Sequence, residues 1–404
     1  MQPFQVLNTR NRCHNLCSSS SISTWYISLL PTCRTIMEFA FTEDQEAFRD
    51  SVKRFVDEKS TTSDVRRLMA TEKGYDENVW KTLSNELALT GLIIPEEFGG
   101  AGFGAIELGI VMEQFGRSLI CAPYLSSSVM AASALLVNGN DDNRHAWLPS
   151  IADGTRKATL AVSEQSGWWD TKEIKAQAIK NQDKYLISGG KRFVVDAHVS
   201  DFLIVAAQSE AGLSLFIVDT KDDQVAIQLE QGMDETRKIC TVDLDNASAQ
   251  TLGNEGEADL EDVLNISSVA LAHEMVGGAQ KMLDSAIEYT KLRVQFGRSI
   301  SSFQAIKHRL ADLLLEVELA KSACYHAAYA IDHQENRSQA ASHAKAQASE
   351  AYTNTAIQCI QLHGGVGFTW ENDTHLWFKR AKSSEVFLGA PHEHRERMLL
   401  ASGI

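Results

Sequence analysis

The apolar residues change their spacing twice along the chain, and this limits the folds open to it. From Phe39 to about Gly139 they recur at the three- and four-residue spacing of helices, and "MEFAFTEDQEAFRDSVKRFV" opens a helix with Thr42 as N-cap. From about Lys157 the spacing becomes two, and runs such as "KYLISGGKRFVVDA" alternate with Gly, Asp and Asn turns. Long helical patterns return from Asp262. The sequence therefore predicts an α+β protein with a β domain between two helical domains.

Four segments follow from these changes. We expect an N-terminal α-helical domain over 37–156, a middle β domain over 157–261 and a C-terminal four-helix-bundle domain over 262–404. Residues 1–36 contain three arginines, no acidic residue and little periodicity. We interpret them as a disordered tail or an upstream extension ahead of Met37, in a bacterial cytoplasmic protein. An acid-poor segment with Ser and Arg is also typical of transit peptides, and this alternative would place the protein in mitochondria.

The charge balance and the cysteines exclude several classes of partner. The 404 residues carry a formal net charge of −15, whereas binding to nucleic acid requires a basic surface, so no nucleic-acid partner is expected. No run of about 18 uncharged apolar residues occurs, and no membrane span is predicted. The seven cysteines form no C-x-x-C pair, and we expect Cys324 and Cys359 to be small buried residues. His363 follows Cys359 by four residues but has no third ligand nearby, so no metal site is predicted.

One stretch, "RVQFGRSISSFQAIKHR" at 293–309, lies between two helical patterns and combines side chains that suit a nucleotide. An Arg can make charge-assisted bonds to a pyrophosphate, Gln can bond ribose or ring edges, and Phe can stack on a flat heterocycle. The helix that follows offers free N–H groups at its N-terminus, where phosphate binds readily. A helical hairpin with buried Phe and solvated Arg explains the same residues. The Arg293 group is the set Arg293, Gln295, Phe296, Phe303 and Gln304.

A second stretch, "QLHGGVGFTWEN" at 361–372, ends a helix in a cluster of glycines. Clustered glycines let backbone N–H groups touch a ligand directly. Glycine at a helix C-terminus is also ordinary capping, so both interpretations stay open. The Gly364 group is the set Gln361, Gly364 and Gly365.

The order of the domains and of these two motifs resembles the acyl-CoA dehydrogenases, flavoproteins that oxidise acyl-CoA thioesters. The resemblance covers essentially all of 37–404 and includes "PEEFGG" at 95–100. It implies that the Arg293 group holds the ADP part of an FAD bound mainly by a neighbouring subunit, and that the Gly364 group meets the same cofactor. It further implies that Ser163 and Phe193 contact the flavin. A cofactor shared in this way implies a dimer or a tetramer, either homo- or hetero-oligomeric.

In this family a Glu base removes the α proton of the substrate while the β hydride passes to the flavin. In "EVFLGAPHEHR", aligned through Gly389 and Arg395, the usual base position is Leu388. Some relatives carry the base on the preceding long helix, where this chain has Ser267. Neither Leu nor Ser is a competent base. Glu274 is the nearby carboxylate of that helix, and it is our candidate for a relocated catalytic base.

The β domain departs from the family pattern as well, because Trp168 and Trp169 replace small residues and Val195 replaces a flavin-facing hydroxyl. These losses resemble a bacterial branch that handles alicyclic or steroid-side-chain CoA esters, often as two unlike subunits. The leading hypothesis is an FAD-dependent acyl-CoA dehydrogenase that passes electrons to an electron-accepting flavoprotein. The alternatives are a base-less partner subunit of a heteromeric enzyme and a flavin monooxygenase on the same fold.

Overall fold

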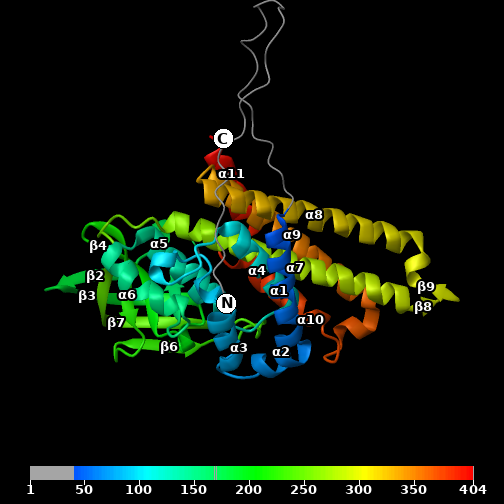
Figure 1. Ribbon diagram of the computed structural model, residues 1–404, viewed down its shortest axis with the longest axis horizontal. Coiled ribbons are helices and arrows are strands. Elements are labelled where there is room, and N and C mark those ends of the chain that lie inside the picture. The colour runs from blue at the N-terminus through cyan, green and yellow to red at the C-terminus, as the bar shows by residue number, and fades with distance from the viewer. Residues whose placement is uncertain (1–40, 168, 170, 404) are drawn as a thin grey trace, which may run out of the picture. The chain divides into compact units, whose positions relative to one another are not determined.

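The computed structural model describes residues 41–403 except 168 and 170, so the segment predicted as a tail, 1–36, and Trp168 lie outside the described residues. Helices fill the N-terminal third (Figure 1). The first begins directly after Thr42, whose Oγ accepts a hydrogen bond from the Gln45 backbone N–H while the Gln45 side chain accepts one from the Thr42 backbone, so the predicted N-cap is confirmed. The α-helices of this part are α1 (Glu43–Lys59), α2 (Thr62–Met69), α3 (Glu77–Lys81), α4 (Ala105–Ser118), α5 (Ala132–Asn138) and α6 (Asp141–Ala152).

The middle part is a seven-stranded sheet. Its strands are β1 (Ala158–Ala161), β2 (Gln177–Asn181), β3 (Lys184–Val195), β4 (Phe202–Ser209), β5 (Gly212–Asp219), β6 (Val225–Leu229) and β7 (Ile239–Leu252). The order is β1-β4-β2-β3-β7-β5, and β4 also pairs with β5, so β4, β2, β3, β7 and β5 form a closed ring of paired strands. Closure leaves few unpaired edges, and the ring encloses its own apolar core, which includes Ile187, Val205 and Phe216.

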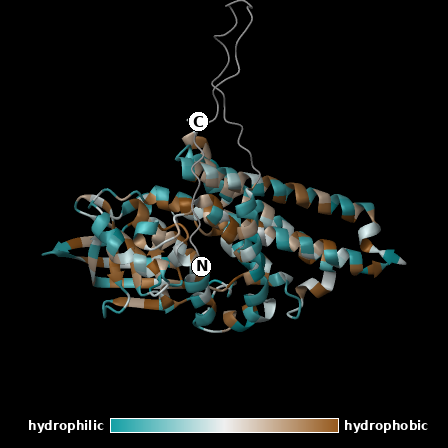
Figure 2. Ribbon diagram, viewed as in Figure 1, coloured by the Kyte–Doolittle hydropathy of each residue, from teal (hydrophilic) through white to brown (hydrophobic). Residues whose placement is uncertain are grey.

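The C-terminal part is again helical, with a small hairpin between its two longest helices. Its elements are α7 (Leu260–Leu292), β8 (Val294–Gln295), β9 (Arg298–Ser299), α8 (Gln304–His333), α9 (Arg337–His363), α10 (Thr374–Val386) and α11 (Pro391–Ala401). Polar and apolar residues alternate along α8, as expected of a helix that packs on one side, whereas residues 267–279 of α7 are all buried (Figure 2). Cys324 and Cys359 are fully buried, as predicted. The order of helices, sheet and helices confirms the predicted α+β class.

Two glycines bring α4 unusually close to α7. A Cβ on Gly116 would lie 1.8 Å from the Glu274 carbonyl oxygen, and a Cβ on Gly277 would lie 1.8 Å from the Glu113 carbonyl oxygen. Only glycine allows this approach, which fixes the middle of α7 against the N-terminal helices. The position of Glu274 is therefore set by backbone packing.

Across residues 41–403, apart from 168 and 170, no helix combines the length and the apolar character that a membrane span requires. The same part of the chain contains no group of three or more His, Cys, Asp or Glu side chains placed to bind a metal ion.

Candidate functional site

The turn between α10 and α11 carries the position at which the resemblance places the base. Leu388 adopts a left-handed backbone conformation with φ 62°, and Gly389 follows with φ 108°. A left-handed conformation costs an ordinary residue roughly 1–2 kcal/mol, so the surrounding structure must hold it. The Leu388 side chain is 1% exposed and belongs to the main apolar core. An apolar packing residue thus occupies the turn.

Two buried side chains hold this turn by its carbonyl groups. The Lys345 ammonium of α9 donates hydrogen bonds to the carbonyl oxygens of Gly389 at 3.1 Å and Glu385 at 3.2 Å, and to Ser349 Oγ at 3.2 Å. His394 Nε2 donates to the Leu388 carbonyl oxygen at 3.0 Å. Burial lowers the pKa of Lys345 to about 7 and that of His394 to about 3, so the imidazole is neutral at neutral pH.

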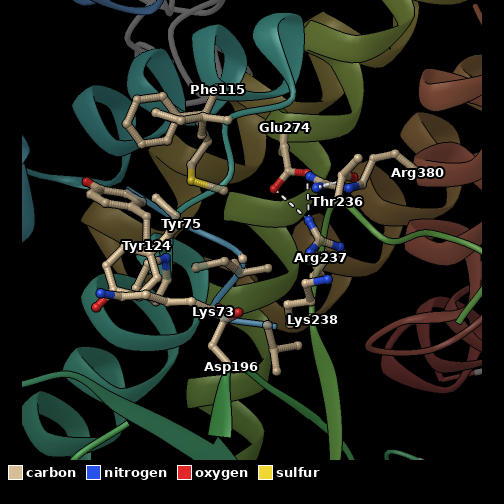
Figure 3. A pocket seen from close by; sticks show the side chains of 17 residues that line it. Lys73, Tyr75, Phe115, Tyr124, Asp196, Thr236, Arg237, Lys238, Glu274 and Arg380 are labelled. Atoms are coloured by element: carbon tan, nitrogen blue, oxygen red, sulfur yellow. Dashed lines mark hydrogen bonds and ion pairs between the residues drawn. The ribbon is translucent and has the colours of Figure 1, made fainter. Parts of the chain in front are cut away.

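Glu274, the candidate base, lies in a buried cluster of charges (Figure 3). Both of its carboxylate oxygens accept hydrogen bonds from Arg237 Nη2, at 2.6 and 2.7 Å, and one also accepts from Arg380 Nη1 at 2.7 Å. Arg380 in turn donates to Asp234 at 2.8 Å and to Thr236 at 2.6 Å. Burial by itself would raise the pKa of Glu274, but the two guanidinium groups outweigh burial and lower this pKa.

The space beside this cluster is too small for an acyl chain. A cavity of about 30 Å³ remains there, lined among others by Phe115, Tyr124, Arg237 and Glu274. Such a volume holds water but no organic ligand. A carboxylate with a lowered pKa, two bound guanidinium groups and no room for a substrate is poorly suited to proton abstraction. These contacts favour a structural role for Glu274.

The two β-domain residues expected at the flavin lie near the ends of β1 and β3. Ser163 is 1% exposed, and within the described residues its Oγ has no hydrogen-bond partner. Phe193 has a positive φ of 57° and is 47% exposed, although it is a large apolar side chain. Its neighbour Val195 is buried. A buried hydroxyl without a partner and an exposed aromatic ring both fit a flat polar ligand such as a flavin.

The Arg293 group surrounds the hairpin of β8 and β9. Phe296 is 90% exposed, so the alternative of a hairpin with a buried Phe is wrong for this residue. Phe303 lies 6.1 Å from it in an edge-to-face arrangement, and Arg298 covers the Phe303 ring at 4.0 Å. Gln295 and Gln304 are exposed. The Arg293 guanidinium, also exposed, has no partner among the described residues, so it is available to an anionic ligand.

The Gly364 group lies next to the Arg293 group, because the helices that carry them meet at a stacked pair of rings. Tyr289 of α7 and His363 of α9 stack at 4.1 Å, and the Tyr289 hydroxyl donates to the His363 carbonyl oxygen at 3.3 Å. His363 Nδ1 bonds the Cys359 carbonyl oxygen at 2.8 Å, as expected of a satisfied helical histidine. Gln361, Gly364 and Gly365 are exposed, and no atom lies within 4 Å of a Cβ built on either glycine. This surface is open to a ligand.

One chain does not bring all the predicted cofactor residues together. The β domain precedes α7 and the hairpin follows it, and the 33 residues of α7 span about 50 Å. Figure 1 shows the sheet and the hairpin at opposite ends of this helix. The Arg293 group therefore needs a second subunit to face a flavin site of the kind predicted at Ser163 and Phe193.

Sequence reasoning missed the charge cluster around Glu274 and the hydrogen bonds of Lys345 to the turn that carries Leu388. Arg237, Arg380 and Lys345 come from segments far apart in the chain and follow no motif.

Comparisons with known proteins agree with the order of helices, sheet and helices along the chain. Models of the "Acyl-CoA dehydrogenase" N-terminal, middle and C-terminal domains match residues 42–155, 159–247 and 254–401. The chain is 32% identical over 357 residues to "Acyl-CoA dehydrogenase IpdE2" of Mycolicibacterium smegmatis, covering 88% of this chain and 98% of the relative. It is 29% identical over 363 residues to "Caffeyl-CoA reductase-Etf complex subunit CarC" of Acetobacterium woodii, covering 86% and 95%.

Among solved structures, a chain of the ChsE4-ChsE5 complex from Mycobacterium tuberculosis superimposes with a TM-score of 0.84. It is 27% identical to this chain, and the match covers 91% of this chain and 99% of the other.

Proposed function

Because this chain belongs to the acyl-CoA dehydrogenase family, whose members are FAD-dependent oxidoreductases acting on the CH–CH bond of acyl-CoA, we propose that it is the base-free subunit of a heteromeric acyl-CoA dehydrogenase. A related subunit carries the catalytic glutamate, and this chain completes an FAD site between the two. Similarity to a chain of the ChsE4-ChsE5 complex supports a heteromer.

The observation that carries the proposal is the state of the two positions that could supply a base. Abstraction of an α proton needs a basic group with a pKa near the working pH and within reach of the substrate. Leu388 has no such group. Glu274 has a carboxylate, but Arg237 and Arg380 bind it and lower its pKa. A base supplied by another subunit would replace both the base that is absent at Leu388 and the arginine-bound carboxylate of Glu274.

The open surfaces define what this chain contributes to the cofactor site. The Arg293 group and the Gly364 group would hold the ADP part of FAD, with the Arg293 guanidinium donating to the pyrophosphate and backbone N–H groups at Gly364 and Gly365 approaching it closely. Ser163 would donate its hydroxyl to the ring system, and Phe193 would cover the ring. FAD, when bound, supplies the acceptor for the substrate hydride.

We extend the proposal to the electron acceptor. An electron-accepting flavoprotein would reoxidise the flavin, in keeping with the relative CarC, which is named as a subunit of an Etf complex. A bacterial cytoplasmic setting fits the bacterial relatives IpdE2 and CarC.

The test is to purify the chain alone and together with a related subunit that keeps the glutamate of the aromatic-Glu-Gly-Thr turn. We expect no acyl-CoA-dependent bleaching of flavin and no reduction of an artificial electron acceptor by the chain alone, and turnover once the partner is present. Turnover by the isolated chain would overturn the base-free assignment and return Glu274 as the candidate base. Substrate-dependent oxygen consumption with reduced flavin would instead indicate a monooxygenase.

A further inference from the structure

A second and larger cavity opens beside the turn that carries Leu388. Its volume is about 350 Å³, and it lies between the loop after β1, the start of α7, and α11. Its lining includes Trp169, Glu261, Leu264, Asn265 and Arg397. The cavity is large enough for a substantial part of an organic ligand.

Trp169 lines this cavity and also contacts the segment that carries Leu388. The indole is 5% exposed and meets the Phe387 ring edge to face at 4.9 Å. Phe387 and its neighbour Leu388 are 5% and 1% exposed, and neither lines the cavity. The Trp169 ring therefore lies between the cavity and the Phe387 ring.

Along α7, the residues that follow the cavity lining lie deeper in the protein. Leu264, which lines the cavity, is 7% exposed, and Ser267 and Ser268, on the next turn of the helix, are 0% and 3% exposed. The same helix then reaches Glu274 in the charge cluster. A ligand that entered along α7 would meet the Trp169 and Phe387 rings before it reached any of these deeper residues.

We infer that Trp169 is a steric plug that keeps a CoA thioester in the outer cavity from reaching the Leu388 turn. This inference deepens the proposed function, on which it rests for the class of ligand. An indole is the largest side chain available, and a buried one excludes both ligand and water from the space it fills. A base-free subunit with an open channel would hold substrate without converting it, and the plug prevents such unproductive binding.

The plug can be tested without a partner subunit, FAD or turnover, through the reactivity of a thiol placed at the turn. Leu388→Cys is prepared alone and together with Trp169→Ser, Trp169→Leu or Trp169→Phe. Each protein is treated with iodoacetamide, whose iodide the cysteine thiolate displaces to form a thioether, and the peptide containing position 388 is quantified by mass spectrometry. Reading that peptide alone removes the background from the seven native cysteines.

We expect alkylation at position 388 to be at least tenfold faster with Trp169→Ser or Trp169→Leu than with Trp169 intact, and to stay slow with Trp169→Phe. Trp370→Ser, which removes a tryptophan that is 58% exposed, should leave the rate unchanged. Thermal melts identify variants that lose the fold. If either Trp169→Ser or Trp169→Leu fails to fold, the other variant still tests the plug. Equal rates in a folded Trp169→Ser or Trp169→Leu protein would overturn the plug.

A binding measurement with the native turn identifies the ligand class. A non-reactive CoA thioether is titrated by calorimetry into the chain with Trp169, with Trp169→Ser and with Trp169→Phe. We expect at least a tenfold gain in affinity for the Ser variant alone, and no gain would overturn the thioester part of the inference. Because neither experiment measures turnover, activity of the isolated chain would remove the proposed function and leave the steric result standing.

Discussion

Arg237 and Glu274 form a doubly hydrogen-bonded ion pair, at 2.6 and 2.7 Å, in which the side chains are only 6% and 8% exposed. Breaking a buried pair by removing one charge leaves the other without compensation, which costs about 3–5 kcal/mol. Here the loss of Glu274 would leave Arg237 in the interior without a hydrogen-bonded carboxylate, whereas Arg380 would keep Asp234 at 2.8 Å. The contribution of this carboxylate to stability is therefore expected to exceed any contribution to chemistry.

Glu274→Gln should lower the free energy of unfolding by about 3–5 kcal/mol, measured by urea denaturation at neutral pH. Glu288→Gln on the same helix is the matched control, because Glu288 is exposed, and it should change stability by less than about 0.5 kcal/mol. A Glu274→Gln protein as stable as the wild type, with its catalysis selectively lost, would identify Glu274 as a base.

The same pair predicts an acid dependence with a definite sign. The pKa of Glu274 is lowered from its usual 4.5, so its ion pairs stabilise the fold above that value, and this contribution is lost as the pH falls through the lower folded-state pKa. The difference in unfolding free energy between wild type and Glu274→Gln should shrink as the pH is lowered below about 4.5. A difference that stays constant down to acid unfolding would contradict the assignment.

Lys345 predicts a further rise of stability with pH, at higher pH values. Burial lowers its pKa in the folded state to about 7, whereas an unfolded lysine keeps a value of 10.5. Between these values the unfolded chain binds more protons than the folded one, so the unfolding free energy rises with pH, although Glu385 and Glu393 oppose part of the shift. The unfolding free energy of the wild type should therefore rise relative to that of Lys345→Met between roughly pH 7 and pH 8.5.

The control for Lys345 is Lys291→Met, which removes an exposed lysine of α7. It should show no such pH-dependent difference from wild type. A Lys345→Met protein that follows the wild type in parallel over the whole range would show that Lys345 keeps its proton in the folded state.

Arg293→Ala should weaken retention of FAD by the assembled complex. It removes a charged hydrogen bond to the pyrophosphate, worth roughly 1.5–3 kcal/mol, or about 10- to 150-fold in affinity. Flavin content after gel filtration, read by absorbance, measures the effect. Arg54→Ala, an exposed arginine of α1, should retain flavin as the wild type does. Equal occupancy in Arg293→Ala would remove this residue from the cofactor site.

The sequence predicted the order of helices, sheet and helices because apolar periodicity is a local property. The N-cap at Thr42 and the glycine cluster at 364 and 365 could also be predicted, because both depend on residues that are close together in the sequence. The cluster at Glu274 was not, because the loop that carries Asp234 and Arg237 and the helix that carries Arg380 are far from Glu274 in the sequence. From the sequence, Glu274 was a candidate for a relocated base, and its contacts with Arg237 and Arg380 were visible only in the structure.

The left-handed backbone at Leu388 also bears on how this position can evolve. Lys345 and His394 hold the turn in that conformation through hydrogen bonds to the carbonyl oxygens of Gly389 and Leu388. No single nucleotide change converts a leucine codon into a glutamate codon, and the shortest routes pass through valine or glutamine. A β-branched valine is strongly disfavoured at positive φ, and glutamine would bury an amide in an apolar core. The backbone conformation and the apolar surroundings of Leu388 therefore disfavour both single-nucleotide intermediates on the way to a glutamate.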